Sequence, residues 1–348
     1  MRYSAIFAAF AACASSMGVN ATAQTITSGP ITGAIFDTAT RSIRSIMGLP
    51  GAAFLGAAAS STWDLAMPSP DGKRAVALRG AELSLIGDLS QPDAATDLGG
   101  VIETVDRMVW SADSSTAVLY SSRSNQLQRI TGLNTTPAIQ PPIDLSGAGG
   151  VSGWAISPEG GSIAYATNTS VYLLAGASSG SAISLGGFSN PRALAFSSDG
   201  ASLFVFDRAT QKISRVATAS GATLDSFAVS TDTANRVAGP SRSAGVLRRM
   251  PPVRQTSQPD IRDLAATTDG AKLLAARADA FCVYDLSRQA PDHCDSLDVS
   301  PASIQAIGPG VFVLNYPRTS GLPVWLWDGG AGSVFFVPSG RSATNVPN

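Results

Sequence analysis

The stretch SPDGKRAVAL, residues 69–78, is a short polar turn followed by an apolar run, and the chain repeats this pattern. Four further versions are SADSSTAVLY (111–120), SPEGGSIAYA (157–166), SSDGASLFVF (197–206) and TTDGAKLLAA (267–276). Their acidic residues, separated by 42, 46, 40 and 70 positions, are Asp71, Asp113, Glu159, Asp199 and Asp269. A period of about 40 to 46 residues is the length of one propeller blade, a four-stranded antiparallel sheet.

The residues around each acid explain the turn chemically. Ser or Thr stands two residues before the acid, and Gly or Ser stands directly after it. The hydroxyl and the carboxylate can hydrogen-bond the backbone of their own turn, and glycine tolerates the positive φ that closes it. Apolar runs such as 108–110 and 117–120 suit inner strands packed between neighbouring blades. Alternating runs such as 126–130 and 212–216 predict outer strands.

These features predict a single all-β domain, a propeller of six or seven four-stranded antiparallel blades. A sixth unit has its turn at Gly308–Gly310, 41 residues past Asp269, and stays in phase. Residues 31–57 predict an outer-strand hairpin that closes the ring by pairing with strands from the other chain end. The 70-residue step leaves room for a degenerate blade around 234–250, so both blade counts stay open.

The repeat resembles the WD40-like and YVTN-type β-propeller repeats of exported bacterial proteins, in which SPDG forms the tight turn between the two inner strands. The resemblance covers about residues 63–338 and implies the fold, but it says little about the function. The GH signature of eukaryotic WD40 repeats is absent, and the WD dipeptide occurs only at residues 63–64 and 327–328, without the regular repeat of that family.

The first residues, MRYSAIFAAFAACASSMGVNATAQ, predict a secretory signal peptide. Arg2 supplies the positive charge, residues 6–14 the apolar segment, and residues 21–23 a small-x-small cleavage pattern. We therefore expect residues 1–23 to be removed, leaving residues 24–348 as the propeller domain of a periplasmic or secreted protein. We expect no membrane anchor in it, because the apolar run is shorter than the ~20 residues of a spanning helix.

The three cysteines of the chain bear on the compartment of the protein. An alternative to cleavage after residue 23 is a lipoprotein anchored through Cys13, with Phe10-Ala11-Ala12 before it as a lipobox. If the signal peptide is removed, only Cys282 and Cys294 remain, flanking a hairpin-like stretch. An oxidising compartment favours a disulfide between them, and two buried free thiols are the alternative.

Composition restricts the partners. The formal net charge of −1 argues against nucleic-acid binding, which usually requires a basic patch or stripe. One segment, about 231–260, is nonetheless rich in arginine and contains little acid. It is interpreted either as a basic lip that docks an acidic partner or as a solvated insertion, which its Pro, Ser and Gly content supports.

Candidate ligand-binding residues lie where the inner strands begin, on the face opposite the SPDG turns. In propellers the inner strands converge there on a central channel, which ligands often enter. The candidates are Asp64, Asp106, Arg192, Arg262 and Asp263. Their mixed charge predicts a site for a polar small molecule or a divalent metal, with the Asp carboxylates as hard oxygen ligands. The alternative is mutual ion pairing that closes the channel wall.

Catalytic patterns are scarce in the sequence. The single histidine, His293, adjoins Cys294 in the presumed hairpin, and no serine lies in a G-x-S-x-G elbow. We therefore expect a non-catalytic, monomeric binding module without a cofactor, whose partner is an envelope protein or a polar small molecule. The alternative is a lactonase-like propeller hydrolase, which would use one divalent metal held by carboxylates at the channel mouth.

Overall fold

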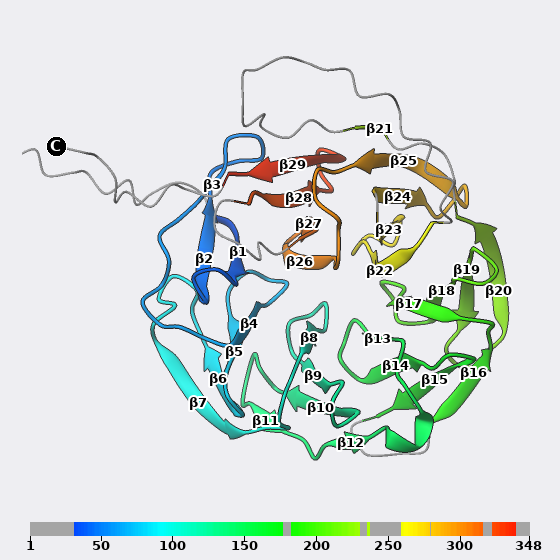
Figure 1. Cartoon of the computed structure of the whole chain (residues 1–348), viewed down its shortest axis with the longest axis horizontal. Helices are drawn as coiled ribbons and strands as arrows, with labels where there is room; N and C mark the ends of the chain where they lie inside the picture. The colour runs from blue at the N-terminus through cyan, green and yellow to red at the C-terminus, as the bar shows by residue number, and fades with distance from the viewer. Residues whose placement is uncertain are drawn as a thin grey trace, which may run out of the picture.

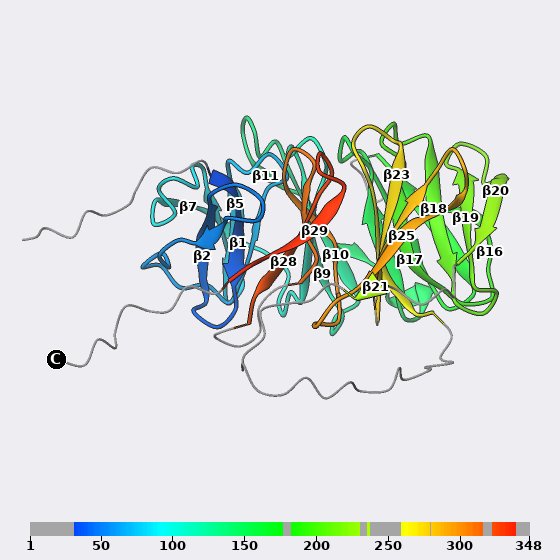
Figure 2. The ribbon, with the colours of Figure 1, turned by 90° about the horizontal axis from the view of Figure 1, so that it is seen from above.

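The computed structural model describes residues 31–176, 182–229, 235–236, 259–278, 280–315 and 322–338. They form seven β-sheets arranged around a central axis, which is the architecture of a β-propeller (Figure 1). Viewed from the side, the ring is a disc one blade thick (Figure 2). The predicted all-β propeller is confirmed, and the number of blades is seven.

The blades follow the chain order. Blade 1 contains β1 (Ile31–Asp37), β2 (Ser42–Met47) and β3 (Phe54–Leu55). Blade 2 contains β4 (Leu65–Pro68), β5 (Ala75–Arg79), β6 (Glu82–Ile86) and β7 (Ala95–Gly100). Blade 3 contains β8 (Arg107–Trp110), β9 (Ala117–Ser121), β10 (Gln126–Thr131), β11 (Ala138–Ile139) and β12 (Ile143–Asp144). Blade 4 contains β13 (Gly153–Ile156), β14 (Ser162–Ala166), β15 (Ser170–Ala175) and β16 (Ile183–Gly187).

The remaining blades complete the ring. Blade 5 contains β17 (Pro191–Phe196), β18 (Ser202–Asp207), β19 (Lys212–Ala217) and β20 (Thr223–Ala228). Blade 6 contains β21 (Asn235–Arg236), β22 (Ile261–Ala266), β23 (Lys272–Arg277), β24 (Phe281–Asp285) and β25 (Ala290–Ser296). Blade 7 contains β26 (Gln305–Gly308), β27 (Val311–Val313), β28 (Val324–Asp328) and β29 (Ser333–Val337). Within the described ranges the helical structure is one short 3₁₀ turn, Ser146–Ala148.

Each blade runs from the axis outward, with antiparallel pairing between neighbouring strands. Seven strands line the axis: β1, β4, β8, β13, β17, β22 and β26 (Figure 1). The acidic turns join the first and second strands of blades 2 to 6, as the repeat predicts. An exception to antiparallel pairing is β21, which adds to β25 in parallel.

The core consists of apolar layers between neighbouring blades. Between blades 2 and 3, Val76 and Leu78 of β5 belong to one buried cluster with Met108 of β8 and Leu119 of β9. The strands are buried on both faces because each blade has a neighbour on both sides, which explains their nearly continuous apolar sequences. The burial of each such large apolar side chain stabilises the folded state by about 1.5–3 kcal/mol.

Blade 1 corrects the prediction of an outer hairpin for residues 31–57. Strand β1 lies innermost in its sheet and packs between β26 and β4, so this segment forms a blade of its own. Ile35 and Ile46 join Ile307 and Val313 of blade 7 in one buried cluster. Among the described residues, blades 1 and 7 thus meet by side-chain packing, whereas the predicted pairing of strands from the two chain ends is not found.

Two other sequence predictions concern the periphery of the ring. The Cys282–Cys294 disulfide is confirmed, and it joins β24 to β25 at residues directly opposite in register. The expected signal peptide and most of the Arg-rich segment 231–260 lie outside the described residues. Within the described part of the chain, no helix has the length and apolar character needed to span a membrane.

Candidate ligand-binding cavity

The acidic turns share one set of hydrogen bonds. In blade 3, the Ser111 hydroxyl donates to Asp113 Oδ1 (2.5 Å) and accepts the N–H of Thr116 (3.0 Å). Asp113 Oδ1 also accepts the N–H of Ser115 (3.0 Å). The residue between them, Ser114, has φ of 59°, the left-handed value that the other four turns reach with glycine.

These bonds favour the ionised form of two turn acids, Asp199 and Asp269. The hydroxyl of Ser197 and the N–H of Ala201 lower the pKa of Asp199 below its ordinary value. The hydroxyl of Thr267 and the N–H of Ala271 do the same for the pKa of Asp269. Hydrogen bonds donated to a carboxylate favour its charged form, and the turn face therefore keeps its negative charge at neutral pH.

Neighbouring turns also contact each other. The N–H of Asp71 donates to the Ser114 hydroxyl (3.1 Å), and the N–H of Asp113 donates to the Pro158 carbonyl (3.1 Å). Because both bonds connect one blade to the next, the turns form a continuous arc on one face of the ring. We call the five turn acids at this face the acidic rim: Asp71, Asp113, Glu159, Asp199 and Asp269.

A cavity of about 570 Å³ occupies the middle of the ring. Its walls come from β4, β8, β13, β17, β22 and β26, and it reaches the turn face at Pro70, Asp113 and Glu159. Small-molecule sites in proteins have volumes of about 300–1,000 Å³ and mostly apolar walls with a few polar groups. The cavity fits both criteria.

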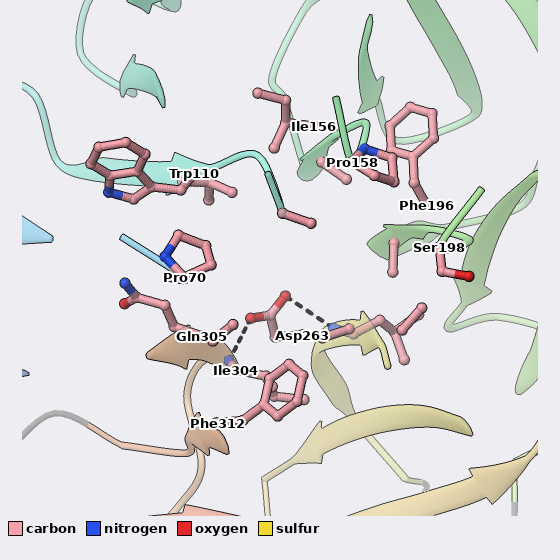
Figure 3. Close-up of a pocket in the computed structure, with 18 of the residues that line it drawn as sticks. Pro70, Trp110, Ile156, Pro158, Phe196, Ser198, Asp263, Ile304, Gln305 and Phe312 are labelled. Carbon is pink, nitrogen blue, oxygen red and sulfur yellow. Dashed lines mark hydrogen bonds between the residues drawn. The ribbon is translucent and has the colours of Figure 1, made fainter. Parts of the chain in front are cut away.

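The wall is largely aromatic and aliphatic. Figure 3 shows Trp110, Phe196 and Phe312 arranged around the open space, and Trp154 also lines it. The indole N–H of Trp110 donates to the Met67 carbonyl (3.0 Å), so this ring is already satisfied as a hydrogen-bond donor. Such walls favour the apolar part of a ligand.

Asp263 places a carboxylate in this apolar wall (Figure 3). Its Oδ2 accepts the N–H of Ile304 (2.7 Å) and its Oδ1 accepts the N–H of Leu264 (3.0 Å). The residue is half-buried and lines the cavity. Burial raises the pKa of Asp263 from the ordinary 3.8 to about 6, opposed by the two N–H donors and more weakly by the positive charge of Arg107.

Gln305 supplies a second acceptor in the cavity wall. Its amide Nε2 donates to the Pro68 carbonyl of blade 2 (2.9 Å), across the position of blade 1. Its Oε1 is buried and has no hydrogen-bond partner among the described residues. A buried acceptor left unpaired costs about 1–3 kcal/mol, so the cavity is more favourable when a ligand or water donates to this oxygen.

The other predicted site residues lie outside the cavity wall. Asp64 pairs with Arg41 and accepts the N–H of Gly80 (2.7 Å), which holds the turn after β5. Asp106 holds the turn after β9 in the same way, by accepting the N–H (2.9 Å) and hydroxyl of Ser122. Both carboxylates thus have partners within their own or an adjacent blade.

The two predicted arginines occupy equivalent β-bulges. Arg192 lies in the bulge of β17 and Arg262 in the bulge of β22. Arg262 donates to the Ser300 hydroxyl (2.9 Å), whereas Arg192 Nε is buried without a hydrogen-bond partner in the described ranges. Of the five predicted residues, Asp263 therefore lines the cavity, and the cavity reaches the SPDG-turn face instead of the predicted opposite face.

Groups with catalytic or metal-binding chemistry do not converge in the described part of the chain. There, no three Asp, Glu, His or Cys side chains lie together in a way that could hold a metal ion. His293 is on the outermost part of blade 6, 3.7 Å from Asp292 and 3.8 Å from Asp295. Within these ranges, the carboxylates that the sequence suggests as metal ligands hold turns or the cavity wall instead.

Sequence reasoning missed the cavity wall itself. Asp263 stands six residues before its turn acid, and the equivalent position in blade 3 is Arg107. Aligning the repeats on their turn acids could have shown that Asp263 and Arg107 are opposite charges at the same level of the ring. No sequence signal indicated that Gln305 would reach from blade 7 to blade 2.

Comparisons with known proteins support the fold. No protein-family model matches the chain, and no curated protein does. A similar solved structure is that of a functionally unknown protein from Desulfotomaculum acetoxidans DSM 771, which is 14% identical. The match covers 88% of this chain and 95% of that chain with a TM-score of 0.58. At this identity the likeness shows the propeller fold alone.

Proposed function

We propose that the protein is an exported, non-catalytic binding propeller that holds a small molecule in its central cavity. The observation that carries the proposal is the cavity of about 570 Å³, with aromatic walls and two buried acceptors, Asp263 and Gln305. A large apolar pocket with a few convergent polar groups and a carboxyl of perturbed pKa is a reasoned candidate binding site.

The chemistry near Asp263 favours binding over turnover. Both carboxylate oxygens already accept backbone N–H groups, which orient the side chain as part of the wall. A hydrolase of the lactonase type would need a metal or a nucleophile with its base. The described residues that line the cavity supply carboxylates, hydroxyls, an amide and aromatic surface.

Export is part of the proposal. The signal-peptide pattern of residues 1–23 supports it, and the Cys282–Cys294 disulfide is compatible with an oxidising compartment. We also expect the protein to be a monomer, which binds either a small molecule or an envelope protein at the turn face.

The test uses N-phenyl-1-naphthylamine, an uncharged dye that fluoresces in apolar sites. Trp110 and Trp154 line the cavity, so bound dye should accept excitation energy from them. Ala112→Trp narrows the mouth and should weaken dye binding about tenfold or more, because the dye loses access to the buried apolar wall. Ala201→Trp is the matched control, since Ala201 is also exposed and follows an equivalent turn but does not line the cavity.

Two results would contradict the proposal. One is a lack of saturable dye binding to the wild-type protein. The other is equal affinity in the wild type and in Ala112→Trp, because the dye would then be bound elsewhere. Isothermal titration with each variant measures the affinity independently of fluorescence.

A further inference from the structure

We infer that the central cavity selects ligands that carry a protonated amine on an apolar body. This inference rests on the proposed binding function and adds the chemical class of the ligand. It follows from three properties of the ring: the unused acceptors of the cavity, the engaged donors of its wall and the charge of its entrance.

The Asp263 carboxylate offers a ligand unused acceptor positions. Each oxygen of the Asp263 carboxylate accepts one backbone N–H, and an ionised carboxylate offers about four acceptor positions in all. About two positions therefore remain for a ligand.

Three side-chain donors of the wall are already engaged. Trp110 Nε1 donates to the Met67 carbonyl, and Gln305 Nε2 donates to the Pro68 carbonyl. At the mouth, the Thr267 hydroxyl donates to Asp269 Oδ1 (2.5 Å). An ammonium group on a ligand supplies about three donors of its own, which can bond to the carboxylate oxygens of the cavity.

The charge of Asp263 also lacks a salt-bridge partner in the described part of the chain. Arg107 of β8 is the cation whose field reaches it, but Arg107 is exposed and no ion pair joins the two side chains. A buried charge is costly until an opposite charge compensates it. A bound ammonium group would provide that compensation and about two further charge-assisted hydrogen bonds.

The entrance favours the same class of ligand. The acidic rim surrounds the turn face, and Asp113 and Glu159 of the rim line the cavity itself. One rim acid, Asp71, is partly compensated by Arg74 (3.4 Å), and Asp269 lies in the weak field of Lys272. A rim of mostly unpaired carboxylates raises the local concentration of cations and repels anions.

Aromatic faces complete the site. Trp110, Trp154, Phe196 and Phe312 line the cavity together with Asp263. Aromatic rings bind apolar groups and also attract cations through their negative faces. The apolar body of the ligand therefore lies against these rings while its ammonium group reaches Asp263.

The experiment compares matched ligands by isothermal titration at pH 7.5. Three apolar bodies, benzyl, naphthylmethyl and adamantylmethyl, are each tested as the amine, the alcohol and the carboxylate. For the body that fits best, we expect the amine to bind about tenfold or more tightly than the alcohol, and the carboxylate not to bind. Asp263→Asn should remove this preference, whereas Asp64→Asn, outside the cavity wall, should keep it.

The wild-type protein offers a second measurement that needs no variant. Because the free Asp263 carboxyl has a pKa of about 6, the amine affinity should fall about tenfold from pH 7 to pH 5. The alcohol affinity should stay constant over the same range. This measurement remains informative if Asp263→Asn fails to fold.

The outcomes separate the inference from the proposed function. If amine and alcohol bind equally, or if Asp263→Asn keeps the amine preference, the inference is wrong while a neutral binding cavity stands. An amine affinity that is unchanged between pH 7 and pH 5 also contradicts the inference. If neither the matched ligands nor N-phenyl-1-naphthylamine bind, both the inference and the proposed function are wrong.

Discussion

Replacing Asp263 by Asn should change how stability depends on pH. The pKa of Asp263 is raised from 3.8 to about 6 in the folded protein, so the folded state holds a proton that the unfolded state has already released. Stability conferred by the wild-type residue therefore falls as pH rises from about 4 to about 6, and it stays constant above that. A difference of about 2 pH units corresponds to about 3 kcal/mol.

Asn cannot ionise, so the stability of the Asp263→Asn variant does not fall in this way as pH rises. Its amide keeps one acceptor for the N–H groups of Leu264 and Ile304 and leaves the other unpaired, at a cost of about 1–3 kcal/mol that does not depend on pH. The free energy of unfolding of the variant, relative to that of the wild type, should therefore rise by roughly 3 kcal/mol from acidic to neutral pH. This change does not depend on the absolute stability of the variant.

Urea unfolding of both proteins at intervals from pH 4 to pH 8, followed by tryptophan fluorescence, measures this difference. Asp88→Asn is the control, because the N–H and hydroxyl of Ser90 lower the pKa of that exposed carboxyl, so its free-energy difference from the wild type should stay nearly constant from pH 4 to pH 8. If the free-energy difference between Asp263→Asn and the wild type is constant across the range, the Asp263 carboxyl is solvated and our account of the cavity is wrong.

Three further predictions concern the ring. A Cβ at Gly153 would lie 2.0 Å from the Arg192 carbonyl oxygen, so Gly153→Ala should lower the free energy of unfolding in urea by about 3 kcal/mol. Gly187→Ala is the control and should not lower it, because the nearest atom to a Cβ there is 3.9 Å away. Ser111→Ala removes the hydroxyl that joins Asp113 to the Thr116 N–H and should cost about 1–2 kcal/mol by the same assay; an unchanged midpoint would contradict the turn network. Replacing Cys282 and Cys294 together by Ser should cost about 3 kcal/mol, and reductant should then no longer affect the unfolding midpoint of the variant.

The sequence predicts the blades well because their turns are local. The Ser-Pro-Asp-Gly pattern needs only residues within one turn, and its hydrogen bonds recur from Ser69 to Thr267. The apolar strands beside each turn can be read in the same window. Blade 1 has no such turn, which is why the sequence alone predicts outer strands for residues 33–37. Their burial between two blades depends on contacts with β26, nearly the whole length of the chain away.

The site was harder to predict because it depends on how the seven inner strands are spaced. Asp64 and Asp263 are both acids near the start of an inner strand, but one caps a turn while the other lines the cavity. Asp64 stands seven residues before its turn acid and Asp263 six, so the two acids occupy different positions of the repeat and point to different sides of the strand.

The spacing of the inner strands also explains why the cavity lies where it does. Blades 4 and 5 approach so closely that only glycine fits at residue 153. On the other side, Gln305 spans from blade 7 to blade 2 and keeps the wall open around Asp263. The same repeat that builds the blades places its acids around the mouth. A binding site for cations therefore requires only one further substitution in the repeat, a carboxylate at position 263, and this is the residue whose charge the fold leaves uncompensated.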